Sequence, residues 1–227
     1  MDEAVDRAAD FLLTSDRCRV IATANPEMIM MAQNDPSLAH ALREADLVVP
    51  DGVGAVWALN RQYGLQQTRV AGFDLTQNIL ALSAKKGYRV FFFGGAPGVA
   101  MTAKENAEAK YPGLTVCGVR DGFFAETEES DIVRMINEAK ADFVLVALGV
   151  PKQENWIMQH KDELTASLII GVGGTLDVMA GVVQRAPKWM QEAKLEWLFR
   201  LLCQPKRILR MLALPRFVLA VLCAKKR

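Results

Sequence analysis

The chain has 227 residues, 51% of them hydrophobic and 23% charged, which excludes a disordered polypeptide and fits one domain with an appendage. Its net charge of +1 hides an asymmetry, because residues 185–227 carry a net charge of +9 and residues 1–184 a net charge of −8. A basic tail on an acidic body indicates that the tail has an anionic partner of its own.

The first residues, 1–13, are acidic and lack the basic segment and apolar run of a secretory signal. Beyond them, short runs rich in β-branched or aromatic residues alternate with segments of helical periodicity. This alternation predicts an α/β fold, a Rossmann-like and mostly parallel sheet with helices on both faces. The strands are expected at Arg19–Thr23, Asp46–Val49, Arg89–Phe93, Leu114–Val119, Asp142–Leu148 and Leu168–Val172, and the clearest helices at Ala96–Lys110, Glu128–Lys140 and Lys152–Leu164.

Polar or glycine-containing turns follow most of the predicted strands. In a parallel sheet, ligands bind beyond the carboxyl ends of the strands, so these turns are expected to surround a binding site. They are Thr23–Pro26, Pro50–Gly52, Gly94–Gly95, Gly149–Glu154 and Gly173–Thr175.

Asp51 is the strongest candidate for a catalytic group. It follows an apolar strand directly and stands between Pro50 and Gly52. A carboxylate there can be partly desolvated and directed at a ligand, which suits a general base. The alternative is an N-cap for a helix that starts near Val53, a common use of Asp.

Two glycine-rich turns resemble phosphate-binding turns at helix N-termini. The first, Gly94–Gly98, lacks the full GxGxxG spacing, and its alternative is an ordinary tight turn. The second, Gly171–Asp177, adds a carboxylate. Asp177 is a candidate for holding a sugar or ribose hydroxyl, or else an acid of the first helical turn.

The remaining polar candidates each have an ordinary alternative. Arg69 is either a phosphate ligand or a solvated loop charge. Gln153 and Glu154 either face the site or simply start a helix. His40 and His160 have no metal-ligand partner in the sequence, and no DxD triplet occurs, so no metal is expected.

After Gly181 the sequence changes character, because prolines at 187, 205 and 215 break it into short helices, two of them expected at Lys188–Leu202 and Lys206–Ala213. Arginines and lysines interleaved with Trp and Phe are typical of a basic amphipathic surface for anionic lipid. The alternative is a packed or dimer-forming hairpin, which would make the chain a homo-oligomer; a nucleic-acid partner is not expected.

The apolar stretch Met211–Ala224 is too short to span a membrane. The four cysteines have neither CxxC pairing nor metal-ligand spacing, which favours reduced thiols in the cytosol. We therefore expect a cytoplasmic location.

Seven motifs together resemble the WecG/TagA/CpsF glycosyltransferases (glycosyltransferase family 26). The resemblance covers nearly the whole chain, in the right order, and the PDG, GxPKQE and RAPxW…LEWLxR motifs are specific when they occur together. The motifs are TANPEM, ADLVVPDGVG, RVAGFDL, VFFFGG, LVALGVPKQENWI, IGVGGTLDVMAG and RAPKWMQEAKLEWLFRL…PKR.

This resemblance implies an inverting transfer, without metal or cofactor, of N-acetylmannosamine or a related sugar from UDP. The implied acceptor is undecaprenyl-diphosphate-linked N-acetylglucosamine, in the synthesis of teichoic acid, capsule or surface polysaccharide. It also implies a catalytic domain at 1–184 and a membrane-associating appendage at 185–227, peripheral at the inner face of a bacterial cell membrane. Family members usually have a short strand-containing stretch before the helix that begins here at Asp2, so an edge strand is expected to be missing.

The resemblance also implies roles for individual residues. Asp51 would be the general base, and Thr23 would also be catalytic. Thr23 and Asn25 would line the sugar pocket. The implied contacts to donor or acceptor are Arg69, Gln153 and Asp177 in the body and Arg200, Arg207 and Arg210 in an appendage that closes over the site.

Two other function classes stay open. A nucleotide-binding oxidoreductase would explain the parallel sheet, but it should show GxGxxG after the first strand, where TANPE stands. A non-catalytic membrane-binding module would explain the tail but not the cluster of polar turns at the strand ends.

Overall fold

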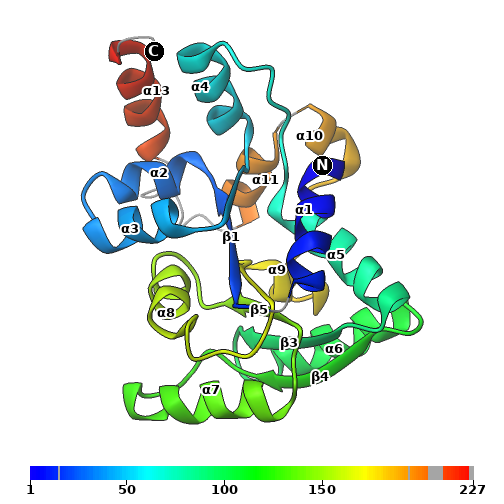
Figure 1. The fold of residues 1–227 in the computed structure, drawn as a ribbon. Coiled ribbons are helices and arrows are strands. Elements are labelled where there is room, and N and C mark those ends of the chain that lie inside the picture. The colour runs from blue at the N-terminus through cyan, green and yellow to red at the C-terminus, as the bar shows by residue number, and fades with distance from the viewer. Residues whose placement is uncertain (15, 194, 204–211, 225–227) are drawn as a thin grey trace.

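The computed structural model describes residues 1–14, 16–193, 195–203 and 212–224. Within them, an all-parallel six-stranded sheet runs through the centre in the order β2-β1-β6-β5-β3-β4 (Figure 1). The predicted fold class is confirmed, and each predicted strand is present within two residues of its expected bounds. The strands are β1 (Arg19–Ala24), β2 (Leu47–Pro50), β3 (Arg89–Gly94), β4 (Thr115–Arg120), β5 (Phe143–Ala147) and β6 (Leu168–Gly171).

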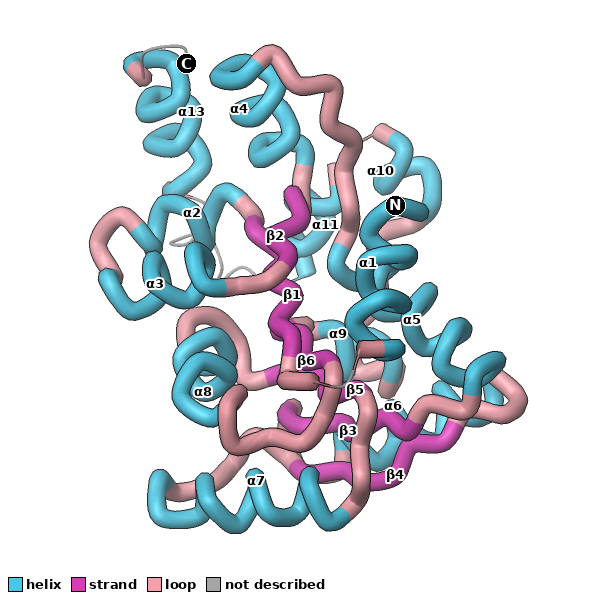
Figure 2. Tube along the Cα trace, viewed as in Figure 1, coloured by secondary structure: helices cyan, strands magenta, loops and turns pink. Residues whose placement is uncertain are grey.

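Helices cover both faces of this sheet (Figure 2). The strand side chains alternate between the two cores: on β3, Val90 and Phe92 pack into one, and Phe91 and Phe93 into the other. All four are fully buried, as expected of parallel strands that lie between two helical layers. The first core includes α1 (Asp2–Leu13), α5 (Gly72–Lys86), α6 (Val99–Lys110) and α9 (Thr175–Met179), and the second α7 (Glu129–Glu138) and α8 (Lys152–His160).

The order of the strands sets the position of the site. β1 pairs with β2 on one side and with β6 on the other, and β6 pairs with β5. The carboxyl ends of these strands therefore meet at one edge, where the following segments leave the sheet in different directions. The helices α2 (Pro26–Ala32), α4 (Val53–Tyr63), α8 and α9 all begin at that edge, and α3 (Pro36–Glu44) follows α2 and packs on α8.

The tail differs from its predicted form. A single helix over Lys188–Leu202 is wrong, because the segment forms α10 (Lys188–Glu192) and α11 (Glu196–Cys203). Glu196, which follows the break, pairs with Arg69 of the body and with Arg185, and helical periodicity does not reveal these contacts. The helix predicted at Lys206–Ala213 lies almost entirely outside the described residues.

The last helix, α13 (Ala213–Cys223), packs on α2 and α4 (Figure 1). Pro215 does not break it, because a proline is tolerated in the first turn, where its missing N–H has no intrahelical acceptor. Phe217 and Val221 are buried, and Gln62 Nε2 donates to the Val221 carbonyl oxygen over 2.8 Å. Among the described residues, no helix is both long and apolar enough to cross a membrane.

Candidate active site

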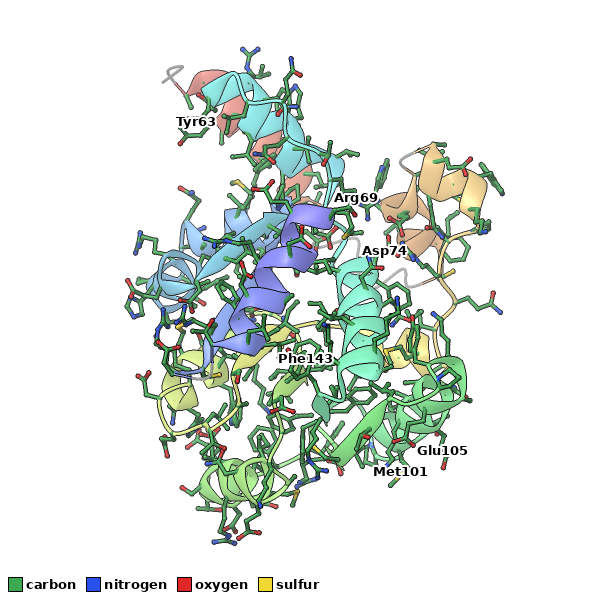
Figure 3. The ribbon with its side chains drawn as sticks, turned by 45° about the vertical axis from the view of Figure 1, so that its right-hand side comes forward. Tyr63, Arg69, Asp74, Met101, Glu105 and Phe143 are labelled. Carbon is green, nitrogen blue, oxygen red and sulfur yellow. The ribbon has the colours of Figure 1, made fainter. Side chains whose placement is uncertain are left out.

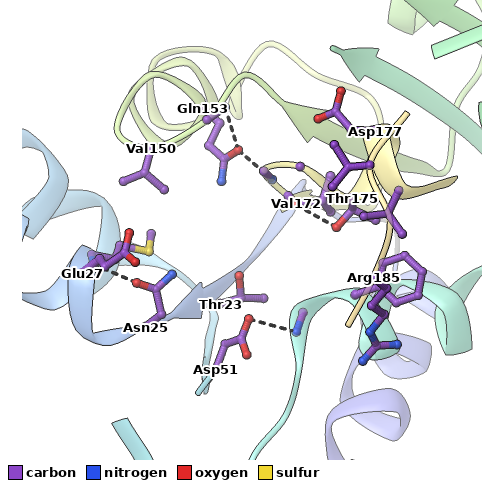
Figure 4. Close-up of a pocket in the computed structure, with 18 of the residues that line it drawn as sticks. Thr23, Asn25, Glu27, Asp51, Val150, Gln153, Val172, Thr175, Asp177 and Arg185 are labelled. Carbon is purple, nitrogen blue, oxygen red and sulfur yellow. Dashed lines mark hydrogen bonds between the residues drawn. The ribbon is translucent and has the colours of Figure 1, made fainter. Parts of the chain in front are cut away.

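A cleft of about 540 Å³ opens at the carboxyl edge of the sheet, as expected for this topology. Its walls come from the ends of β1 and β2, from α2, from the turns after β5 and β6, and from α11. Five of the residues predicted from sequence line it together: Thr23, Asn25, Asp51, Gln153 and Asp177 (Figure 4).

Asp51 lies at the end of β2 and is not a helix cap. The N-cap of α4 is Gly52, with a φ of 94° that favours glycine, and no side chain caps this helix. The Asp51 carboxylate instead accepts from the Gly72 N–H at 3.3 Å and from the Arg69 guanidinium at 3.4 Å. The capping alternative is therefore wrong, and the carboxylate is held at the cleft by one backbone donor and one cation.

The end of β1 brings Thr23 and Asn25 to the same wall. Asn25 caps α2, because its Oδ1 accepts from the Met28 N–H at 3.0 Å, and its amide nitrogen is left toward the cleft (Figure 4). Thr23 lies against Gly72, where a Cβ would come within 3.2 Å of the threonine hydroxyl. The lack of a side chain at Gly72 thus lets its N–H approach Asp51 beside Thr23.

Gln153 joins the turns that follow β5 and β6. Its Oε1 accepts from the N–H groups of Gly149 at 3.2 Å and Gly173 at 3.0 Å, and its Nε2 donates to Glu154 Oε1 at 2.7 Å. Burial raises the pKa of the Glu154 carboxyl above its ordinary value of 4.5. The Gln–Glu pair therefore does more than start a helix, since it fixes the geometry of two glycine turns.

The turn after β6 contributes Thr175 and Asp177. The Thr175 hydroxyl donates to the Val172 carbonyl oxygen at 2.7 Å, which tightens the turn. Asp177 stands in the first turn of α9, and burial raises the pKa of its carboxyl. The other glycine turn, Gly94–Gly98, does not belong to the lining of this cleft, and the Gly95 N–H donates to the Ala147 carbonyl oxygen at 3.0 Å.

Arg69 reaches the site through Asp51, although it is not part of the cleft lining. It also pairs with Glu196 of α11, so it is not a solvated loop charge. Sequence reasoning missed Arg185, which lines the cleft and pairs with Asp74 at 2.6 and 2.8 Å and with Glu196 at 3.4 Å.

Arg69 and Asp74 lie on the side of the body that faces α10 and α11 (Figure 3). The hydrogen bonds that Arg185 donates to Asp74 raise the pKa of its guanidinium. Arg185 and Glu196 both stand in the RAPxW…LEWLxR motif, which was the one sequence signal that could have pointed to them.

The three tail arginines are placed only in part. Arg200 belongs to α11, whose Phe199 and Cys203 line the cleft, but its side chain lies outside what the structure describes. Arg207 and Arg210 also lie outside the described residues. In the part of the chain that is described, no group of three or more His, Cys, Asp or Glu side chains is arranged to hold a metal ion.

The chain is similar to one family of known proteins along its whole length. The model of the glycosyl transferase WecG/TagA/CpsF family matches residues 1–227. The chain is 34% identical to an N-acetylglucosaminyldiphosphoundecaprenol N-acetyl-beta-D-mannosaminyltransferase of Bacillus subtilis, over 91% of this chain and 80% of that protein. Proteins of the same name from Bacillus spizizenii and Staphylococcus aureus are 36% and 31% identical, over 92% and 91% of this chain and 81% of each relative.

Proposed function

The chain belongs to the WecG/TagA/CpsF family of glycosyl transferases, and we propose that it moves N-acetylmannosamine or a related sugar from UDP to a lipid-linked acceptor. The acceptor is undecaprenyl-diphosphate-linked N-acetylglucosamine, the substrate in the names of the three relatives. The transfer inverts the anomeric centre and serves teichoic acid or another surface polysaccharide. Family membership argues against the oxidoreductase and the non-catalytic membrane module.

The placement of Asp51 is the observation that carries this proposal. An inverting transfer needs a base that takes the proton of the acceptor hydroxyl while the sugar is transferred. Asp51 is a strand-end carboxylate in a ligand-sized cleft, and it does not cap α4, the helix that follows it. The Gly72 N–H and the Arg69 guanidinium hold this carboxylate at the cleft, where an acceptor hydroxyl can reach it.

The second requirement is positive charge for the departing UDP diphosphate. Arg185 lines the cleft, and Arg69 lies beside the base. Guanidinium groups pair bidentately with phosphate oxygens and stabilise the charge that develops as the sugar leaves. Arg200, Arg207 and Arg210 of the tail add to this set. No metal or cofactor takes part in the proposed mechanism.

The remaining cleft residues bind the sugar. Thr23 and the Asn25 amide are placed beside the base, where they reach hydroxyl or acetamido groups. Asp177 holds a second hydroxyl from the opposite wall. Gln153 acts mainly by holding the two glycine turns in place, because both ends of its amide already have partners inside the protein.

The enzyme works at the inner face of the bacterial cell membrane, attached peripherally through its tail. The net charge of +9 over residues 185–227 supports this location. So do large apolar side chains that are exposed on the tail, among them Trp189, Trp197 and Leu219. A lipid-linked acceptor requires such a position, because its diphosphate head group stays at the membrane surface.

Replacing the base tests the proposed function. We expect Asp51→Asn to lower UDP release in the presence of a prenyl-diphosphate-linked acceptor by about 10²–10⁴-fold, because the amide cannot accept the proton. UDP-sugar binding, measured by calorimetry, should stay within a few fold of wild type. The matched control is Asp131→Asn on the exposed face of α7, which should keep full activity.

Two outcomes would contradict the proposal. Near-normal turnover by Asp51→Asn with the natural acceptor would show that this carboxylate is not the base. Thermal stabilisation of the wild-type protein by NAD(P) but not by UDP would favour the oxidoreductase instead. A panel of UDP-sugars in the same assay identifies the donor.

A further inference from the structure

Glu196 is an almost fully buried carboxylate that belongs to the tail and pairs with two arginines, Arg185 of the cleft lining and Arg69 behind it. Its side chain is only 9% exposed. Burying a charge is unfavourable unless the charge is paired, and Glu196 has two partners. Its Oε2 pairs with Arg69 Nη2, and its Oε1 lies 3.4 Å from Arg185 Nε.

Both arginines connect Glu196 to Asp51, Arg69 directly and Arg185 through Asp74 and the start of α5. Arg69 lies 3.4 Å from Asp51 Oδ1. Arg185 binds Asp74 bidentately at 2.6 and 2.8 Å, in the first turn of α5. That helix begins at Gly72, whose N–H donates to Asp51 Oδ2 at 3.3 Å.

The contacts therefore close a ring around the proposed base. Arg69, one partner of Glu196, contacts Oδ1 of Asp51. The N–H at the start of α5 contacts Oδ2, and Arg185, the other partner of Glu196, holds α5 through Asp74. Glu196 is the member of the ring that α11 supplies, and it connects the two arginines. When α11 is in place, the orientation of the base and of both cations is fixed.

We propose that Glu196 is a positioning residue for the transfer reaction and that it couples docking of α11 to assembly of the catalytic geometry. The inference rests on the proposed function, because it needs Asp51 as the base and Arg69 and Arg185 as cations for the diphosphate. Glu196 itself touches neither sugar nor phosphate in this scheme. Its effect on catalysis passes through the two arginines.

The charge of the Glu196 carboxylate distinguishes a positioning role from a purely structural one. In the ring, three carboxylates share two guanidinium groups, so Glu196 competes with an incoming diphosphate for Arg69 and Arg185. Removing its charge is expected to leave UDP binding unchanged or to tighten it. The same change loosens the two arginines and the base, which lowers the rate of transfer.

The test is Glu196→Gln, which keeps the size of the side chain and removes its charge. We expect kcat to fall by about 10-fold to 100-fold, the range associated with small displacements of catalytic groups. The dissociation constant of UDP, measured by calorimetry, should not rise. Hydrogen–deuterium exchange should increase in α11 and in residues 64–72 together, because both lose the same ion pair.

Matched variants separate the ring from general effects on the tail. Glu192→Gln changes an exposed glutamate of α10 that forms no ion pair with a described residue, and it should leave kcat, UDP binding and exchange as in wild type. Glu196→Asp keeps the charge and should recover part of the lost rate. This variant also provides the test if Glu196→Gln does not fold.

The proposal is overturned if Glu196→Gln keeps kcat within about twofold of wild type. It is also overturned if kcat and UDP affinity fall in proportion, since that is the result expected of a damaged fold. If the wild-type protein transfers no sugar from UDP, the proposed function fails. The exchange and UDP-binding comparison between Glu196→Gln and wild type still tests the ring in that case.

Discussion

At the scale of single residues, Glu154 shows how a buried carboxyl can support the site without taking part in the chemistry. Its Oε1 accepts from Gln153 Nε2, which sets the direction of the amide, so that Gln153 Oε1 faces the Gly149 and Gly173 N–H groups. A buried carboxyl is costly in its ionised form, and burial accordingly raises its pKa above 4.5. The proton therefore stays on Glu154 to a higher pH in the folded protein than in the unfolded chain.

This pKa shift predicts how stability depends on pH. The favourable contribution of the protonated Glu154 is fully present below its unfolded pKa and is lost as the pH rises through the raised folded pKa. Glu154→Gln keeps a carbonyl oxygen for Gln153 and cannot ionise. We expect the free energy of unfolding of the variant, relative to wild type, to rise as the pH is increased above 4.5 in urea titrations. Glu138→Gln on the exposed face of α7 is the control. If the free energy of unfolding relative to wild type does not depend on pH for either variant, the prediction is contradicted.

Single residues also show which parts of the site the sequence could reveal. Asp51, Asn25 and Asp177 were found because each belongs to a turn or helix start that follows a predicted strand, and a parallel sheet brings such segments to one edge. Arg185 and Glu196 were missed because Asp74 and Arg69, with which they pair, lie far from them along the chain. Arg185 and Asp74, for example, are 111 residues apart in the sequence, and no local spacing predicts such a pair.

At the scale of elements, the strands could be predicted because their signal is local. β3 and β5 are continuous apolar runs, typical of strands buried on both faces. Their order in the sheet could not be derived, since right-handed crossovers are compatible with several orders. The division of the tail between α10 and α11 was also missed, because α11 is held by an ion pair of Glu196 with Arg69, which is distant in the sequence.

The docking of α13 gives a prediction for an element as a whole. Phe217 is only 4% exposed, and its ring packs close to Gly54, where the start of α4 also meets Pro26 of α2. Phe217→Ala removes a buried ring and leaves a cavity, so we expect the free energy of unfolding to fall by about 3–5 kcal/mol. Urea unfolding measures this loss.

The neighbouring residue on the same helix provides the control for α13. Val218 is 43% exposed, so Val218→Ala is expected to change the free energy of unfolding by less than about 0.5 kcal/mol. If the two substitutions change the free energy of unfolding equally, the face of α13 that carries Phe217 does not hold this helix in place.

At the scale of the whole molecule, the uneven charge predicts an orientation toward the membrane. The tail carries +9 and the body −8, so an anionic surface attracts the tail and repels the body. The helix α13 lies on α2 and α4 and exposes Leu219 and Leu222. A surface that is both basic and apolar is suited to the interface of an anionic bilayer.

Neutralising the cations beyond the proposed site should weaken membrane binding without affecting the chemistry. Each cation near an anionic surface contributes about 1 kcal/mol, so the fourfold glutamine variant should bind phosphatidylglycerol vesicles markedly more weakly in sedimentation assays. Transfer to a short-chain, water-soluble acceptor should continue at the wild-type rate, because the ring of contacts around Asp51 that the structure describes is formed by other residues. The four residues are Arg216, Lys225, Lys226 and Arg227.

The ionic strength and a control on the body decide whether the attraction is electrostatic and confined to the tail. Wild-type binding should fall as salt is added, because ions screen exposed charges over about 10 Å at 0.1 M. Replacing exposed cations of the body, Lys85, Lys86, Arg134 and Lys140, by glutamine removes the same total charge and should leave vesicle binding unchanged. If the two fourfold variants lose binding equally, net charge alone governs the attraction. If the tail variant binds as wild type does, the basic tail has another partner, and a packed or dimer-forming hairpin becomes the better account of it.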